Sequence, residues 1–422
     1  MIELAEKKAF VNDITKAKIA LKNINWNFYE KSAFSPNELR PFNPRAYHWY
    51  PATFIPEIPF TLIEALTPPR ATVWDPFSGI GTTFFQALSL SRYSRATEIC
   101  TVAVEYMKSL FTLFDPTLNL LKVRLGTEKA LEDFASSKDY SKDVSTEILV
   151  NRLEPWFSSK TLNQLCFLFI KEKKSEKEEK AIYRICISAL LKTASSQDRG
   201  WGCVADNVLP KEEAIIDKNV LKMFKYSARR LTDDISQHRR TLSPDYKVIY
   251  REMSENPPIF HEDLRVCNSI SDNSIDLIVT SPPYPNMTDY VTSQRLSYYY
   301  LGFDLFLKGI SNDGVLEIGA RSRRNRKNSV EAYYEDMKKV NKVISKKLRS
   351  DGYACYILPA FNLDNDNNKL RRQAVQKVIA SMTDCDLIKE EEYERILPQK
   401  RRSHNRLWAT LEREKIYLFR KV

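Results

Sequence analysis

The feature that most constrains the fold is a strand that runs into a glycine turn and then into a helix. The short apolar run Ala71–Trp74 is partly β-branched and stops abruptly at Asp75. Gly79 and Gly81 follow in a Gly-x-Gly turn, and a helix is expected to begin at Thr82. Glycine lets a chain turn tightly and a ligand approach closely because it has no Cβ, and free amides at a helix start can hold a carboxylate. The pattern predicts a ligand-binding strand–turn–helix unit.

A second acidic residue stands at the distance that such a unit uses for a ribose. Glu98 lies 23 residues after Asp75, at the end of the next expected strand. Nucleotide-binding βαβ units place an acid about 20 residues on, where it reaches the ribose hydroxyls. The alternative for Glu98 is an exposed loop carboxylate, and a Gly-x-Gly is often only a turn. This unit alone therefore indicates nucleotide binding without establishing it.

A second buried strand, Ile275–Val279, ends at the loop Ser281-Pro282-Pro283-Tyr284. Two prolines fix φ and donate no hydrogen bonds, so the loop is rigid and its carbonyl groups point outward. The Ser281 hydroxyl and the Pro282 carbonyl can accept hydrogen bonds from a nucleobase amino group. The Tyr284 ring can stack on a base taken out of the duplex. A plain strand-ending turn or a proline-rich ligand segment would not account for the glycine unit.

Strands and helices alternate on both sides of a helical stretch. Residues 1–46 form a polar lead, and 47–107 contain the glycine unit. Residues 108–259 are mainly helical, and 260–422 return to alternation, with strands expected at Tyr353–Leu358 and Lys415–Phe419 and helices at Val330–Leu348 and Ala374–Met382. This order predicts a doubly wound α/β sheet with a mainly helical inserted domain. The charged run Lys171–Lys180 is expected to be a solvated helix end or loop.

Composition limits the partners and the compartment. The 422 residues carry a net charge of +11, which suits a polyanion because basic side chains displace counterions from a phosphate backbone; a basic protein without such a partner is the alternative. The seven cysteines are scattered and only four histidines are present, so neither a disulfide framework nor a metal site is predicted. The charged N-terminus lacks an apolar signal segment, and no run approaches the ~18 apolar residues of a membrane span. We therefore expect a cytoplasmic protein that makes no contact with a membrane.

The two motifs together, DPFSGIGTT from Asp75 and TSPPY from Thr280, resemble the paired signatures of the DNA amino-methyltransferases, the cytosine-N4 and adenine-N6 family. The resemblance implies a Rossmann-like methyltransferase fold and S-adenosylmethionine as the cofactor. It also implies a set of cofactor-binding residues, namely Asp75, Phe77, Gly79, Gly81, Thr82, Thr83, Glu98 and Asp263. Glu262 departs from the pattern, since the family usually has glycine before the acid that meets the adenine. Tyr47–Pro56 resembles the family's segment that closes over the cofactor.

The same resemblance implies methyl transfer to an exocyclic amino group of a base in double-stranded DNA. Ser281, Pro282, Pro283 and Tyr284 would be the catalytic residues, and the loop has no Pro-Cys nucleophile for a covalent route. Serine rather than Asp or Asn before Pro-Pro-Tyr favours cytosine N4 by resemblance. Adenine N6, an RNA base and a non-catalytic DNA-binding subunit remain as alternatives. A restriction-modification role, with a partner endonuclease, is a further expectation.

Two basic loops are candidates for contact with DNA phosphates or guanines. Their residues are Arg321, Arg323, Arg324 and Arg326 in one loop and Lys400, Arg401 and Arg402 in the other. A solvated charge run is the alternative for both. The helical stretch 108–259 is a candidate target-recognition region, although it has no base-reading signature. Asn286, Asp289 and Tyr290 are expected either to shape a base pocket or only to stabilise their loop.

Overall fold

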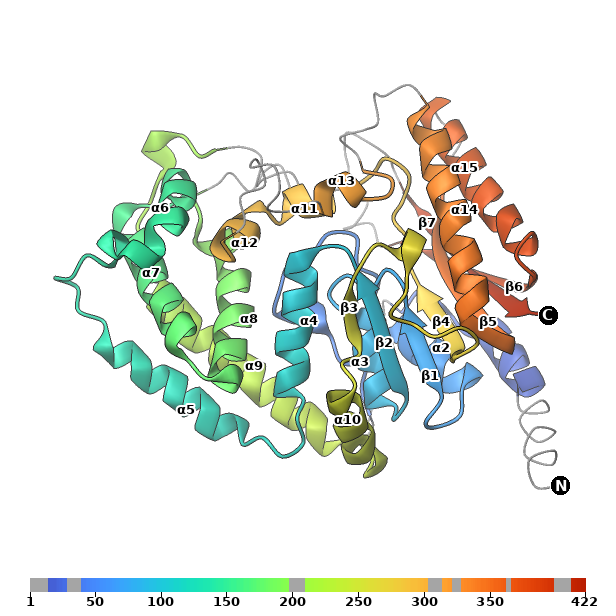
Figure 1. Cartoon of the computed structure of the whole chain (residues 1–422), viewed down its shortest axis with the longest axis horizontal. Helices are drawn as coiled ribbons and strands as arrows, with labels where there is room; N and C mark the ends of the chain where they lie inside the picture. Colours follow the sequence, from blue (N-terminus) through green and yellow to red (C-terminus); the bar gives the residue numbers. More distant parts are fainter. Residues whose placement is uncertain are drawn as a thin grey trace.

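Seven strands form one sheet in the order β3-β2-β1-β4-β5-β7-β6 (Figure 1). The computed structural model describes residues 14–28, 39–196, 209–302, 313–320, 328–361, 366–397 and 411–422. The strands are β1 (Thr72–Asp75), β2 (Tyr93–Glu98), β3 (Ile259–His261), β4 (Ile275–Thr280), β5 (Leu348–Ala360), β6 (Leu387–Ile396) and β7 (Arg413–Lys421). Strands β1 to β5 all run parallel to one another, whereas β7 is antiparallel to both β5 and β6. The predicted doubly wound α/β sheet, consistent with a Rossmann-like methyltransferase fold, is confirmed.

Helices cover both faces of the sheet, and the alternation of side chains along β5 shows how. Tyr353, Cys355 and Ile357 pack into one apolar cluster with α2 (Glu57–Leu66), while Ala354, Tyr356 and Leu358 pack into another with α14 (Ser329–Lys347) and α15 (Asp366–Thr383). Successive side chains of a strand point to opposite faces, so a strand buried on both faces becomes apolar throughout. The first cluster also takes in α3 (Thr82–Ser89) and the helix at 14–22.

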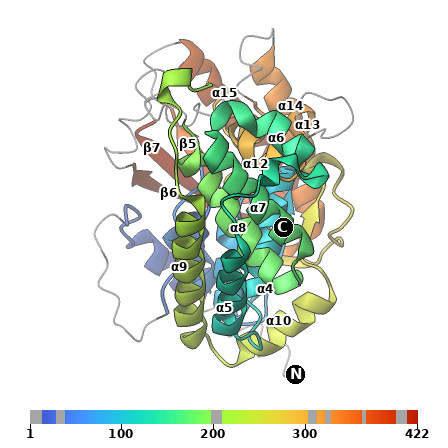
Figure 2. The same ribbon diagram turned by 90° about the vertical axis from the view of Figure 1, so that its left-hand side faces the viewer.

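The mainly helical insertion forms a lobe beside the β3 edge of the sheet (Figures 1 and 2). Its helices are α5 (Leu120–Ala130), α6 (Glu147–Leu153), α7 (Ser159–Lys174), α8 (Lys177–Ala194) and α9 (Val220–Arg240), whereas α10 (Asp245–Glu255) packs on α3 and β2. The helix α4 (Thr101–Leu113) packs on β3 on one side and on α8 on the other. One apolar cluster therefore runs without a break from α3 and α4 into α7, α8 and α9.

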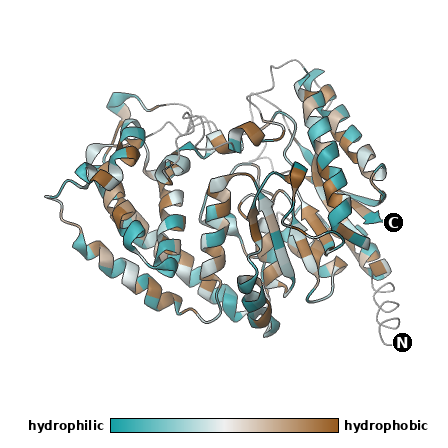
Figure 3. Cartoon of the chain, viewed as in Figure 1, coloured by the Kyte–Doolittle hydropathy of each residue, from teal (hydrophilic) through white to brown (hydrophobic). Residues whose placement is uncertain are grey.

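Apolar residues gather on the inner sides of the helices in both parts of the molecule (Figure 3). Six of the seven cysteines lie in the described segments, and all six are buried and free, as expected. Over the part of the chain that the structure describes, no helix combines the length and the apolar character that a bilayer crossing requires.

One prediction about the helical lobe is wrong in part. The run Lys171–Lys180 does join two helices through a short link, but Glu172 within it is only 2% exposed. The Glu172 carboxylate accepts a hydrogen bond from Arg184 Nε at 2.9 Å and another from the Tyr300 hydroxyl. Helical periodicity places Glu172 one turn after Leu168 on the buried side of α7. Composition alone does not show that one carboxylate of this charged run faces inward.

Candidate active site

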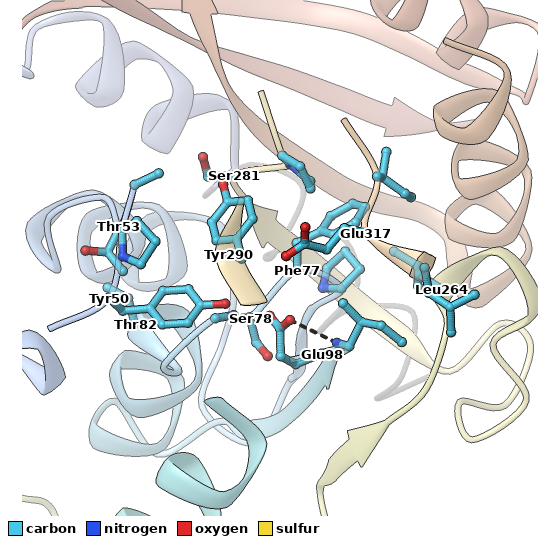
Figure 4. Close-up of a pocket in the computed structure, with 18 of the residues that line it drawn as sticks. Tyr50, Thr53, Phe77, Ser78, Thr82, Glu98, Leu264, Ser281, Tyr290 and Glu317 are labelled. Carbon is cyan, nitrogen blue, oxygen red and sulfur yellow. Dashed lines mark hydrogen bonds between the residues drawn. The ribbon is translucent and has the colours of Figure 1, made fainter. Parts of the chain in front are cut away.

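A cleft opens where β1, β2 and β4 reach their carboxyl ends, with a volume of about 810 Å³ including its mouth (Figure 4). This edge is where open parallel sheets bind ligands. Segments far apart in the sequence meet there. The predicted residues that line the cleft are Phe77, Gly79, Thr82, Glu98, Asp263, Ser281 and Pro283. Tyr50–Phe54, from the segment expected to close over the cofactor, lines it as well.

The two glycines of the turn have different surroundings. Gly79 has φ +51° and Gly81 has φ +85°, a region that side chains other than glycine rarely adopt. A Cβ on Gly79 would lie 3.3 Å from Tyr50 Cε1, at the wall of the cleft. A Cβ on Gly81 would lie 3.0 Å from Met107 and Phe85, in the core. Gly79 therefore borders the ligand space, whereas Gly81 allows α3 to begin against α4.

Glu98 is held at the base of the cleft by backbone amides. Its Oε2 accepts from Gly79 N at 2.7 Å, and its Oε1 accepts from Ile99 N and Cys100 N at 2.9 Å. Burial raises the pKa of Glu98, and these three amides act in the opposite direction. The carboxylate is thus fixed in place next to the glycine turn, in the position expected of a ribose-binding acid.

Asp75 and Thr83 lie behind the cleft and join the two motifs. Asp75 Oδ1 accepts from Thr280 Oγ1 at 2.7 Å and from Phe77 N at 3.1 Å. Thr83 Oγ1 donates to Val279 O at 3.0 Å. Asp75 is 1% exposed, and its Oδ2 has no hydrogen-bond partner among the described residues. Burial raises the pKa of Asp75 to about 7. Contact of either residue with a cofactor stays a prediction.

The Ser281–Tyr284 loop places only part of its residues at the cleft. Ser281 and Pro283 line the cleft, but Pro282 and Tyr284 are not among its lining residues. The Tyr284 hydroxyl donates to Glu414 Oε1 on β7 at 2.9 Å, and Glu414 lies 3.5 Å from Arg395. Both of these charged partners are buried. The ring expected to stack on a base is therefore held at its hydroxyl by a buried ionic group.

Tyr290 supplies an aromatic ring to the cleft, whereas stacking of a base on Tyr284 stays a prediction. Tyr290 begins the short helix α11 (Tyr290–Ser293), and its ring stacks on Tyr50 with centroids 5.8 Å apart. Asn286, by contrast, stabilises the loop, since its Nδ2 donates to Ser329 Oγ at 3.0 Å and its N to Gly319 O at 2.9 Å. Of the expected base-pocket residues, Tyr290 faces the ligand space.

Asp263 lines the cleft, with its carboxylate engaged by Arg265. Arg265 Nε and Nη2 donate to both Asp263 oxygens at 2.7–3.0 Å, and the guanidinium also pairs with Asp336 at 3.1 Å. Glu262 turns toward Cys267 and Asn268. The predicted contact between Asp263 and an adenine amino group stays a prediction.

Sequence reasoning missed the segment Asp313–Ala320, of which Leu316, Glu317 and Ile318 line the cleft. Asp313 Oδ2 anchors it by accepting from Thr101 N at 2.8 Å and from the Tyr298 hydroxyl at 2.6 Å. Hydrogen bonds to Asp313 outweigh its burial and lower its pKa to about 2. No motif or periodicity marks this short segment, so nothing in a single sequence points to it.

The candidate DNA contacts in both basic loops lie outside the described residues, namely Arg321, Arg323, Arg324, Arg326, Lys400, Arg401 and Arg402. Their role stays a prediction, as does target recognition by the helical lobe.

Comparison with known proteins agrees with the motifs. Residues 6–109 match the model of the family N6_N4_Mtase, described as DNA methylase. The chain is also 25% identical over 288 residues to the type II methyltransferase M.BsoBI of Geobacillus stearothermophilus. That alignment covers 62% of this chain and 54% of the relative, so the chain spans about half the length of that relative.

We expect Tyr284→Phe to lower the free energy of unfolding by about 1–3 kcal/mol, because the buried Glu414 carboxylate loses its hydrogen-bond donor. Urea denaturation measures the change. Tyr226→Phe is the control, since Tyr226 is 70% exposed on α9, and it should alter stability by less than about 0.5 kcal/mol. Equal stability of the two variants would contradict the buried contact.

Asp75→Asn should stabilise the ligand-free protein more at pH 8 than at pH 4. The folded pKa of Asp75 is raised to about 7 from 3.8, so between these values the folded state holds the proton that the unfolded state has lost. Wild-type stability from this group therefore falls as the pH rises from about 4 to 7, and asparagine removes that loss. Urea denaturation of both proteins across this range tests the sign, and a pH-independent difference would refute it.

Proposed function

We propose that this chain, which belongs to the N6/N4 DNA methylase family and is a distant homologue of a type II methyltransferase, transfers a methyl group from S-adenosylmethionine to the exocyclic amino group of cytosine (N4) in double-stranded DNA. One observation carries the proposal. The glycine turn, Glu98 and Ser281, which come from three separate segments, line a single cleft at the carboxyl edge of the sheet.

The cleft suits the proposed cofactor in shape and in charge. A Cβ at Gly79 would press on Tyr50, so the turn keeps ligand space open. The lining includes Glu98, Asp263 and Glu317 and, among the described residues, no Lys, Arg or His. Such a lining favours a ligand with positive groups, and S-adenosylmethionine has a sulfonium and an ammonium group. When bound, the cofactor supplies an activated methyl group.

Three contacts hold the cofactor in this proposal. Glu98, already fixed by the Gly79 amide, accepts from the ribose hydroxyls. The amide groups that begin α3 at Thr82 receive the methionine carboxylate. Asp263 meets the adenine amino group, in competition with its hydrogen bonds to Arg265.

The Ser-Pro-Pro loop acts on the target amino group. The Ser281 hydroxyl and the Pro282 carbonyl accept hydrogen bonds from it and align its lone pair with the methyl group. Their stabilisation grows as positive charge develops on the nitrogen. A base inside a duplex cannot reach the cleft, so the base must first be extruded. Tyr290 and Tyr50, stacked in the cleft wall, offer ring surfaces to it.

Serine before Pro-Pro-Tyr supports cytosine N4, and adenine N6 is the alternative. The net charge of +11 supports a nucleic-acid substrate. The relative's type II class supports a place in a restriction-modification system, with a cognate endonuclease as partner.

The methylated product decides the target base. Duplex DNA incubated with the purified protein and isotope-labelled S-adenosylmethionine, then digested to nucleosides, should yield labelled N4-methylcytosine by mass spectrometry. Labelled N6-methyladenine would refute the choice of base. Label in RNA alone, or in no nucleic acid, would refute the proposed reaction.

Ser281→Ala should slow single-turnover methyl transfer about 10- to 100-fold, with cofactor affinity changed less than twofold. A hydrogen bond to a group that gains charge is worth roughly 1.5–3 kcal/mol, and each ~1.4 kcal/mol is tenfold in rate. Ser269→Ala, at an exposed serine ahead of β4, is the matched control and should keep the wild-type rate. Unchanged transfer by Ser281→Ala would remove Ser281 from the chemistry.

A further inference from the structure

We propose that Glu317 makes the cleft prefer the positively charged sulfonium cofactor over the neutral thioether that remains after methyl transfer. The inference rests on the proposed function and adds a specificity-determining residue to it. Nothing in the sequence motifs includes Glu317.

The position of Glu317 is the first support. Glu317 is 4% exposed, yet it lines the cleft between Leu316 and Ile318. Figure 4 shows its carboxyl group pointing into the cleft toward Tyr290, with Glu98 on another side of the same space. Both carboxylates add to the effect of burial in raising the pKa of Tyr290, so both lie within electrostatic reach of that hydroxyl.

The backbone around Glu317 fixes where this charge lies. Val291 N, in the first turn of α11, donates to Glu317 Oε1 at 2.5 Å. Ala320 forms a parallel bridge with Thr288 in the catalytic loop. The carboxylate is therefore held by the first turn of α11, the helix that follows the loop with Ser281.

Besides Glu98, two other acidic residues line the cleft with Glu317, and each has partners of its own. Asp263 is paired with Arg265, and Glu262 turns to Cys267. None of the described lining residues is Lys, Arg or His. No group of three or more potential ligands in the described segments could hold a metal ion. An organic cation is the ligand that fits such a wall.

Methyl transfer would break the S–CH3 bond with the electron pair left on sulfur, which would become neutral, while the amino nitrogen would form the N–CH3 bond and lose one proton to solvent. The attraction to Glu317 then disappears, while contacts to the ribose and adenine remain. A charge pair in a partly dehydrated cleft is worth more than one in bulk water. Glu317 should therefore strengthen binding of the charged cofactor and contribute little to binding of the neutral product.

The test is calorimetric binding of S-adenosylmethionine and S-adenosylhomocysteine to the full chain without DNA. Glu317→Gln keeps the acceptor for Val291 N but removes the charge, and should weaken S-adenosylmethionine binding about tenfold and S-adenosylhomocysteine binding less than twofold. Glu317→Asp should retain most of the wild-type preference. Glu255→Gln, at an exposed carboxylate at the end of α10, is the control and should change neither affinity more than twofold. Equal weakening of both ligands by Glu317→Gln would overturn the proposal.

A third ligand tests the proposal on the wild-type protein alone, should Glu317→Gln fail to fold. An analogue with a protonated amine in place of the sulfonium should bind about tenfold more tightly than S-adenosylhomocysteine. Equal affinities would overturn the role of charge. Wild-type protein that binds none of these nucleosides would instead refute the proposed function.

Discussion

The hydrogen bond between Thr280 and Asp75 is the contact on which the site depends. It joins the carboxyl ends of β4 and β1, which pair in parallel with Val73 opposite Leu277. Because parallel neighbours end at the same edge, the glycine turn and the Ser-Pro-Pro loop leave the sheet side by side. In the proposed function, the cofactor and the target group would meet beside this hydrogen bond, which joins the two motifs.

The helical lobe is connected by hydrogen bonds to chain segments that precede and follow it in the sequence. The Ser188 hydroxyl on α8 lies 3.0 Å from His48 Nδ1, just before the cleft segment, and 3.1 Å from the Ser297 hydroxyl on α12 (Arg295–Tyr300). Burial lowers the pKa of His48 to about 4, so this ring is neutral at physiological pH. Glu172 and Tyr300 make a second link. Movements of the lobe would therefore act on both the cleft wall and the segment that contains Ser297.

Local pattern located the central strands well and the edge strands poorly. The run at Ile275–Val279 was expected as a strand and is β4, because strands buried on both faces are apolar throughout. The edge strand β6 was missed, since LIKEEEYERI carries the charges that keep an exposed edge from pairing and so resembles a solvated run. The sequence also could not distinguish the positions that Tyr284 and Tyr290 take relative to the cleft, for another reason. Only the packing of β7 against the loop directs the Tyr284 hydroxyl to Glu414 and leaves Tyr290 in the cleft wall.

The sequence by itself determined which functional groups are available. They are positive-φ glycines after a buried strand, an acid after the next strand, and a rigid loop of hydrogen-bond acceptors. These features are encoded within a few neighbouring residues, so they can be recognised without a fold. The tertiary structure alone decided which groups share one space. It brought Glu317 to the cleft, placed Asp75 behind it, and paired Asp263 with Arg265. Those outcomes depend on contacts between segments far apart in the chain, which no local pattern records.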